Sequence, residues 1–118
     1  MKHSVFVAIP MFEEVLGQLR QHFDVVDNQA DELFTPKQLA EKLQGHAGAI
    51  TTGTERIDGA LLAACPQLKV VANMAVGFNN FDVPAMTAAG VQATNTPDVL
   101  TETTADFGFA LLMATARR

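Results

Sequence analysis

Short apolar runs alternate with amphipathic segments along the whole of this chain. The apolar runs are rich in Val, Ile and Ala and short enough to be buried strands, and they cover 4–9, 24–27, 47–51, 68–74 and 91–95. After the first run, apolar residues recur at helical spacing with charged residues between them: Phe12, Val15, Leu16, Leu19 and Phe23. The strand–helix unit repeats five times, which predicts a parallel sheet covered by helices.

Capping signals mark where the helices begin and end. Thr35 is predicted to be an N-cap, because Pro36 would occupy the first helical position and Gln38 would complete a capping box. Asp58 and Asp82 precede two further helices, and we expect each of them to cap the helix that follows. Two glycines are expected to end helices: Gly45 and Gly90.

These elements predict one domain of a definite fold class. Right-handed crossovers between parallel strands leave few topologies. We predict a flavodoxin-like α/β fold, with a five-stranded parallel sheet of order 2-1-3-4-5 and helices on both faces. No linker or internal repeat interrupts the chain, so residues 1–118 are expected to form a single domain.

Composition and charge narrow the class of partner. The net charge is −5 and the eight basic residues are scattered, which argues against nucleic acid or an anionic membrane as a partner. No apolar run approaches the roughly 20 residues that span a bilayer, and no leader resembles a signal peptide, so we expect a soluble, cytoplasmic protein. The single cysteine, Cys65, lies among alanines and leucines, which predicts a buried apolar side chain and not a nucleophile.

The turn at 75–82 is the first candidate for a working site. It follows the fourth strand directly, and ligands of open α/β sheets bind at the carboxyl ends of the strands. Gly77 permits a tight turn and the close approach of a ligand, and successive amides around Val76 and Gly77 can converge on a carboxylate. The alternative is an ordinary strand-to-helix turn in which the asparagines tolerate left-handed geometry, and spacing alone favours this alternative.

The other polar residues give weaker signals. The threonines at 51–54 follow the third strand, where their hydroxyls could bind a small polar ligand, although such a loop needs no ligand. Glu102 and Asp106 are four residues apart in the last helix, where acids commonly interact with the helix dipole. The histidines lack the spacing of metal ligands: His3, His22 and His46. The sequence contains no glycine-rich dinucleotide fingerprint, P-loop, CxxC pair or GxSxG motif.

The second half of the chain resembles the D-2-hydroxyacid dehydrogenases. The segments that carry the resemblance are VGFNNFD, NTPDVLTETTAD and LLMATARR, in that order. Within the family they are most similar to the glyoxylate/hydroxypyruvate reductase and 2-ketogluconate reductase branch. The first half follows the family layout more loosely, through LKVVA and the GAITTGTERID loop.

The resemblance implies roles for particular residues. In that family a flavodoxin-like substrate domain faces a Rossmann domain that binds NAD or NADP, and the active site lies between the two. The backbone amides of Val76 and Gly77 would hold the substrate carboxylate, and Gly53 would line the same pocket. Thr104 would contact the cofactor from the substrate-domain side. Asp106 stands where the family usually has Glu.

The same resemblance places the catalytic residues of the family after Arg118. The nucleotide fingerprint, the substrate-orienting arginine, the proton-donating histidine and its paired glutamate would all follow. We therefore expect the substrate-binding portion of an NAD(P)-dependent reductase of a 2-oxo acid such as glyoxylate or hydroxypyruvate. No catalytic residue, bound cofactor or activity is expected in these residues alone. The alternatives are a stand-alone module that binds a small carboxylate without chemistry and a purely structural fragment.

The last helix, at about 100–118, is apolar on more than one side. Its large apolar residues are Phe107, Phe109, Leu111, Leu112 and Met113. Surfaces of this kind usually mark an interaction site. We expect either a monomer in which this helix forms the last layer on the sheet, or a homodimer that forms through the helix or exchanges it between copies.

Overall fold

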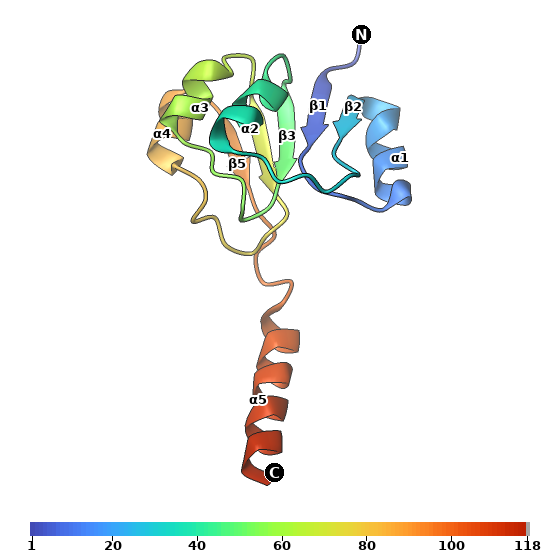
Figure 1. The fold of residues 1–118 in the computed structure, drawn as a ribbon, viewed down its shortest axis with the longest axis vertical. Helices are drawn as coiled ribbons and strands as arrows, with labels where there is room; N and C mark the ends of the chain where they lie inside the picture. The colour runs from blue at the N-terminus through green and yellow to red at the C-terminus, as the bar shows by residue number, and fades with distance from the viewer. Residues whose placement is uncertain (118) are drawn as a thin grey trace.

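The computed structural model describes residues 1–117, in which strands and helices alternate as predicted (Figure 1). The strands are β1 (Ser4–Val7), β2 (Asp24–Asp27), β3 (Gly48–Thr51), β4 (Val70–Asn73) and β5 (Gln92–Thr94). The helices are α1 (Glu13–His22), α2 (Pro36–Leu43), α3 (Gly59–Ala64), α4 (Val83–Ala88) and α5 (Thr101–Arg117). Every predicted element is present, and the predicted ends are off by a few residues at most.

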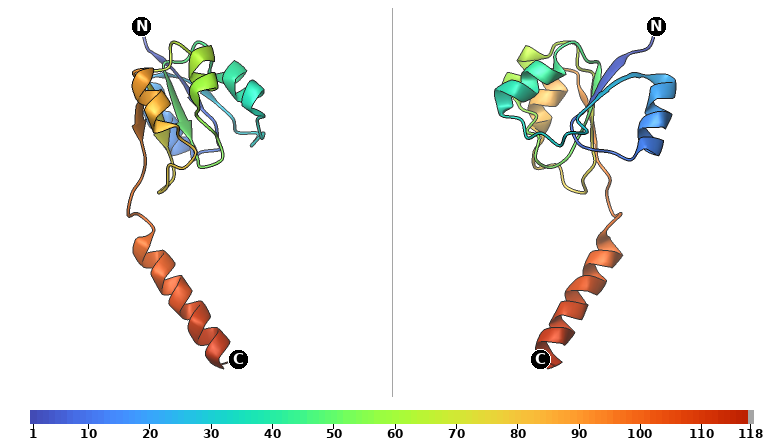
Figure 2. Two further views of the ribbon diagram at one scale, coloured as in Figure 1. Left: turned by 90° about the vertical axis from the view of Figure 1, so that its left-hand side faces the viewer. Right: turned by 45° about the vertical axis from the view of Figure 1, so that its right-hand side comes forward.

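The sheet has the predicted topology. Neighbouring strands are all parallel, in the order β2-β1-β3-β4-β5. Phe6 of β1 is in register with Val26 of β2 on one side and with Ala49 of β3 on the other. The helices α2, α3 and α4 lie on one face of the sheet and α1 lies on the other (Figure 2). The predicted flavodoxin-like α/β fold with helices on both faces is confirmed.

The main core lies between the sheet and the layer of α2, α3 and α4. Side chains of a strand alternate between the two faces, and Phe6, Ala49 and Val71 point into this core. The helices contribute buried residues to it: Leu39, Leu43, Leu61, Leu62 and Met86. Cys65 belongs to the same cluster, and burial raises the pKa of its thiol. A protonated, buried thiol is the inert side chain that the sequence predicted.

The predicted caps are present and explain where the helices begin and end. Thr35 Oγ1 accepts a hydrogen bond from Gln38 N at 3.3 Å, and Gln38 Oε1 accepts one from Thr35 N at 2.9 Å, which completes the capping box. Asp58 and Asp82 each accept from a backbone N–H in the first turn of α3 and α4. Two glycines just after α2 and α4 have left-handed φ angles of +83° and +69°: Gly45 and Gly90.

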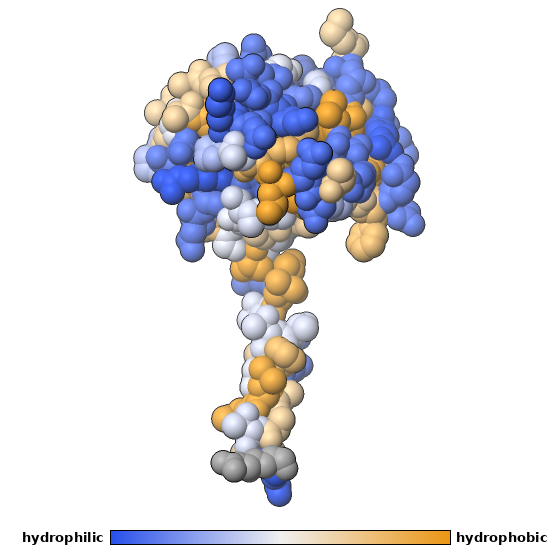
Figure 3. All heavy atoms as spheres, in the orientation of Figure 1, coloured by the Kyte–Doolittle hydropathy of each residue, from blue (hydrophilic) through white to orange (hydrophobic). Residues whose placement is uncertain are grey.

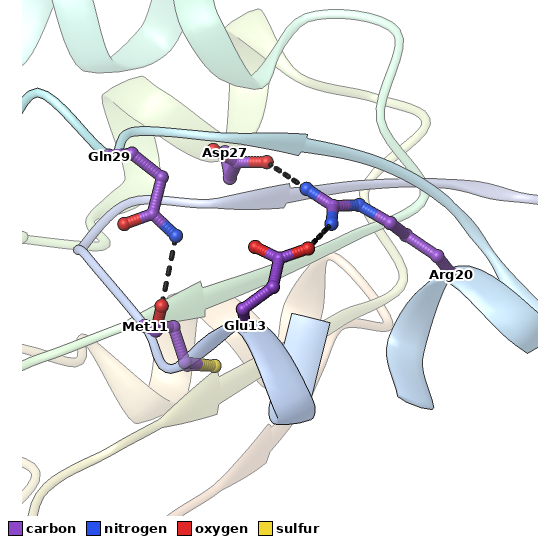
Figure 4. Close-up of polar contacts among 5 residues, drawn as sticks. All are labelled: Met11, Glu13, Arg20, Asp27 and Gln29. Atoms are coloured by element: carbon purple, nitrogen blue, oxygen red, sulfur yellow. Dashed lines mark hydrogen bonds and ion pairs between the residues drawn. The ribbon is translucent and has the colours of Figure 1, made fainter. Parts of the chain in front are cut away.

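Helix α1 is held beside β2 by polar contacts at its first and last turns (Figure 4). The guanidinium of Arg20 forms ion pairs with Glu13 and, at 3.0 Å, with Asp27. Gln29 Nε2 donates to the carbonyl of Met11 at 2.9 Å. Two carboxylates thus share the charge of Arg20, and the hydrogen bonds to them raise its pKa.

The face of the sheet next to α1 is only partly covered. Leu16 is the buried residue of α1, whereas Phe12, predicted to be part of its apolar stripe, is 80% exposed. An apolar groove of about 330 Å³ lies on this face, lined partly by Ile50 and Val70. It reaches the amino ends of the strands at Ala47 and Lys69. Its lining extends to Ile50 and Ala72 but includes no residue of the loops that follow β3 and β4.

Helix α5 projects away from the sheet domain (Figures 1 and 2). None of its described residues is buried, and its apolar side chains lie along a protruding rod (Figure 3). The expectation that this helix forms the last layer on its own sheet is therefore wrong. In the segment before it, Asp98 has a left-handed φ of +64°. No helix in residues 1–117 combines the length and apolar character needed to cross a membrane.

Candidate functional site

The loops that follow β3 and β4 lie side by side at the carboxyl edge of the sheet. Thr51 and Asn73, the last residues of these strands, are partners in the parallel register. Farther along the two loops, Ile57 and Phe81 form a second, isolated parallel bridge. The loops are thus joined at both ends, which makes this edge a defined surface.

A buried polar network fixes the two loops to each other. Thr51 and Asn73 are 0% and 2% exposed, and Thr51 Oγ1 donates to Asn73 Oδ1 at 3.0 Å. Asn73 Nδ2 donates to Gly77 O at 3.0 Å and to Asn80 Oδ1 at 3.0 Å. Asn80 Nδ2 in turn donates to two backbone carbonyls of the 51–55 loop, at 2.9 and 2.8 Å. Buried polar groups satisfied in this way specify one loop geometry.

The predicted residues Val76 and Gly77 lie at the exposed side of this network. Val76 is 40% exposed, and its carbonyl accepts a hydrogen bond from Asn95 Nδ2 at 2.8 Å. The carbonyl of Gly77 accepts from Asn73. Within residues 1–117, no hydrogen bond takes up the N–H of Val76 or of Gly77. Two successive amide donors are therefore available to an anion at this turn.

Two reasons were predicted for a glycine at position 77, a tight turn and the close approach of a ligand, and the backbone angles do not support the first. Left-handed φ angles occur at Gly45 and Gly90 but not at Gly77, so the turn itself does not require glycine there. A Cβ added at Gly77 would meet no atom within 4 Å. Neither Asn79 nor Asn80 has the left-handed geometry that the ordinary-turn interpretation invoked. A side chain at position 77 would therefore extend into the open space next to the Gly77 N–H.

The 51–54 loop places Gly53 at the same edge but does not offer free hydroxyls. Gly53 is exposed, and a Cβ there would meet no atom within 4 Å. Thr52 Oγ1 donates to Glu55 Oε2 at 3.0 Å and Thr54 Oγ1 donates to Glu55 Oε1 at 2.7 Å. The idea that these hydroxyls bind a ligand is not favoured, because the Glu55 carboxylate already accepts from them.

The fourth predicted residue, Thr104, lies apart from the turn. It is exposed on α5, where its N–H donates to Leu100 O at 2.9 Å as part of the helix. Glu102 is the acid in the first turn of α5, as predicted, and Asp106 is exposed one turn later. The structure thus brings Gly53, Val76 and Gly77 to one edge and leaves Thr104 on the projecting helix.

The titratable groups of the described chain give no sign of a metal centre or nucleophile. No group of three His, Cys, Asp or Glu residues in positions 1–117 could hold a metal ion. His46 Nδ1 lies 2.7 Å from Ser4 Oγ, and its ring lies 5.8 Å from that of Phe6. Burial lowers the pKa of His46, so this ring is a packed residue of the domain.

The sequence pointed to the turn but missed the residues that support it. Asn73, Asn80 and Asn95 each hold a carbonyl of the two loops. Their common signal was an asparagine at the end of a predicted strand or within the turn that follows it. A polar side chain is unusual at a strand end buried on both sides, unless it is fully hydrogen-bonded.

Comparison with known proteins agrees with this geometry. The model of the D-isomer specific 2-hydroxyacid dehydrogenase family, catalytic domain, matches residues 5–117. A glyoxylate reductase of Thermococcus gammatolerans is 44% identical over 100% of this chain, which spans 35% of that protein. A glyoxylate reductase of Korarchaeum cryptofilum is also 44% identical, with 36% of its length covered. The chain thus spans about a third of the length of these relatives.

Solved structures give the same result. A protein of Thermus thermophilus superimposes with a TM-score of 0.85 at 37% identity, over 98% of this chain and 37% of that one. The NADPH-dependent glyoxylate/hydroxypyruvate reductase of Sinorhizobium meliloti, solved with NADP and malonate, has a TM-score of 0.70 at 32% identity, over 98% of this chain and 34% of that one. The parallel sheet, the two joined loops and the match over nearly every residue lead to one conclusion: this chain belongs to the D-isomer specific 2-hydroxyacid dehydrogenase family, in the part described as its catalytic domain.

Proposed function

We propose that residues 1–118 are the substrate-binding domain of an NAD(P)-dependent reductase of small 2-oxo acids, of the glyoxylate/hydroxypyruvate kind. The observation that carries the proposal is the pair of unoccupied N–H groups at Val76 and Gly77, at the carboxyl edge of a parallel sheet. Backbone donors that are fixed before a ligand arrives bind a carboxylate with little reorganisation. The relative from Sinorhizobium meliloti was solved with malonate, a small carboxylate, and with NADP.

In this proposal the turn binds and orients the substrate. The amides of Val76 and Gly77 hold the carboxylate, and Gly53 leaves room beside them because it carries no side chain. In the parent reaction the nicotinamide cofactor would supply a hydride to the carbonyl carbon, and the carbonyl oxygen would gain a proton to give the 2-hydroxy acid. We assign neither transfer to a residue of this chain.

The residues of this chain do not fit a complete dinucleotide site. The glycines form no GxGxxG fingerprint, so no pyrophosphate cradle of that type is present in the sequence. Thr104 is proposed to contact the cofactor only where a second domain stands beside α5, since it is exposed on that helix. We accordingly propose that the chain alone binds the acid and does not reduce it. We also propose that it is a cytoplasmic protein, either a monomer or a dimer.

A second function, a carboxylate-binding module without chemistry, is favoured by one observation. The hydrogen bonds that shape the turn all come from residues 51–96 and none from α5. The turn therefore does not depend on the projecting helix. Binding of the acid and its reduction can be measured separately, and these two measurements distinguish the two functions.

The test is an NMR titration of the amides with glyoxylate and pyruvate. We expect the Val76 and Gly77 signals to move with both acids and to remain in place with methyl pyruvate, which has the same carbonyl but no carboxylate. Affinity on the order of 1 mM, about 4 kcal/mol, is expected for half of a cleft. Unmoved signals would refute the site. NADPH oxidation by the purified chain with glyoxylate would refute the assignment of catalysis to residues outside it.

A further inference from the structure

Three consecutive carbonyls of the candidate turn are each held by a hydrogen bond. Ala75 O accepts from Thr96 N at 3.0 Å, Val76 O accepts from Asn95 Nδ2 at 2.8 Å, and Gly77 O accepts from Asn73 Nδ2 at 3.0 Å. The donors come from the end of β4 and from the segment that follows β5. Hydrogen bonds from the ends of two neighbouring strands thus hold the turn.

Holding the carbonyls fixes the direction of the amides. In a trans peptide the C=O and the N–H of the same plane point in opposite directions, and no cis peptide occurs in the described chain. The N–H of Val76 therefore points away from Thr96, and the N–H of Gly77 points away from Asn95. Both face away from the groups that hold the turn, toward the side where hydrogen-bond partners are missing.

The two asparagines differ in how they are supported. Asn73 is 2% exposed, and its Oδ1 accepts from Thr51 Oγ1 at 3.0 Å, so its Nδ2 is aimed at the Gly77 carbonyl by a buried partner. Asn95 is partly exposed and lies in the segment between β5 and α5. Its bond to Val76 O also joins the turn to the segment that leads to the projecting helix.

We infer that Asn95 is a positioning residue for a small carboxylate ligand, because it holds the Val76 carbonyl and thereby aims the Gly77 N–H of the same peptide plane. Asn73 holds the next carbonyl, that of Gly77, and limits the movement of the turn from the other side. Neither side chain contacts the ligand. The inference rests on the proposed function, and it adds that affinity depends on side chains behind the turn. Loss of the Asn95 bond lets the plane between Val76 and Gly77 rotate, so the Gly77 N–H no longer keeps its direction.

Asn95 carries the test, because Asn73 is buried and its replacement can unfold the domain. The variants are Asn95→Ala, which removes the donor, and Asn95→Asp, which places a carboxylate oxygen against the Val76 carbonyl. The matched control is Asn79→Asp, which makes the same charge change in the same turn at an exposed side chain. Each full chain is titrated with glyoxylate, and the ¹³C shift of the Val76 carbonyl reports on its hydrogen bond.

We expect Asn95→Ala to weaken glyoxylate binding roughly five- to tenfold, the size of one hydrogen bond, and to shift the Val76 carbonyl signal before ligand is added. Asn95→Asp should weaken binding more than Asn79→Asp. If wild type binds and Asn95→Ala binds equally well, the positioning role is overturned and the proposed function stands. If wild type does not bind, the proposed function fails and the positioning role fails with it. Equal losses in Asn95→Asp and Asn79→Asp would show a charge effect and also overturn the inference.

Discussion

Thr51 Oγ1 donates a 3.0 Å hydrogen bond to Asn73 Oδ1 at the carboxyl ends of the two adjacent strands β3 and β4. Both side chains are almost fully buried. The bond fixes which way the Asn73 amide faces, and the Nδ2 of that amide holds Gly77 O. A contact inside the sheet therefore determines the shape of an exposed turn.

The first prediction concerns this contact. Thr51→Val keeps the shape of the side chain and removes its hydroxyl, which leaves Asn73 Oδ1 with only a 3.3 Å contact from Asn80. We expect the free energy of unfolding to fall by about 1–3 kcal/mol, the cost of a poorly satisfied buried acceptor. Urea unfolding followed by circular dichroism measures it.

The control for that change is Thr87→Val. Thr87 is exposed on α4 and its hydroxyl donates to the Val83 carbonyl of the same helix. An exposed change of this kind should alter stability by no more than about 0.5 kcal/mol. Similar losses at positions 51 and 87 would show that the buried contact has no special role.

The second prediction separates folding from binding at Gly77. The residue has no left-handed φ, and an added Cβ would meet no atom within 4 Å. Gly77→Ala should therefore keep or raise the free energy of unfolding, by up to about 1 kcal/mol, because alanine restricts the unfolded chain. The same methyl would stand next to the Gly77 N–H and should weaken glyoxylate binding severalfold in the NMR titration.

Gly45→Ala is the contrasting variant. Gly45 has a φ of +83° at the end of α2 and equally open surroundings. Alanine at that angle should cost about 1–2 kcal/mol, with no effect on glyoxylate binding. A stable Gly45→Ala protein, or a Gly77→Ala protein that binds normally, would contradict this account of the two glycines.

The third prediction follows from the lowered pKa of His46. Burial disfavours the protonated ring, so the unfolded state binds the proton more readily than the folded state does. His46 therefore destabilises the fold as the pH drops below its unfolded pKa of about 6.5, and has no such effect above it. Urea unfolding at pH 7.5 and 5.5 should show a larger loss of stability on acidification in wild type than in His46→Gln. His22→Gln, at an exposed histidine, is the matched control, and it should behave as wild type.

Local patterns in the sequence predicted the parts of the molecule that local forces determine. The capping box at Thr35 and the left-handed glycine at position 45 depend on neighbours in sequence, and both were found where predicted. The sheet order followed from the regular alternation of elements. The support of the candidate turn was harder to predict, because Asn95 reaches Val76 across 19 positions. No local pattern specifies such a contact.

Helix α5 was predicted either to pack on its own sheet or to pair with a second copy, and only the first of these is wrong. An element with apolar groups on several sides has no single face to set against a sheet. The apolar character of α5 thus indicates that the helix needs a partner surface, but it does not identify that partner.

The last prediction concerns that partner. The exposed fractions of Phe107 and Leu111 are 65% and 52%, and residues four apart lie on one side of a helix. Exposed apolar surface of this extent favours association, so we expect the purified chain to dimerise through α5 as its concentration rises, as measured by light scattering. Joint replacement of Phe107 and Leu111 by Glu should give a monomer with unchanged helical content.

Leu33→Glu is the control for that experiment, because Leu33 is 87% exposed on the sheet domain and not on α5. It should dimerise as wild type does. If wild type remains monomeric at high concentration with α5 helical, a second copy is not the partner, and the helix is free to contact another domain. If Leu33→Glu also abolishes the dimer, association runs through the sheet domain, and α5 is not the surface that joins two copies.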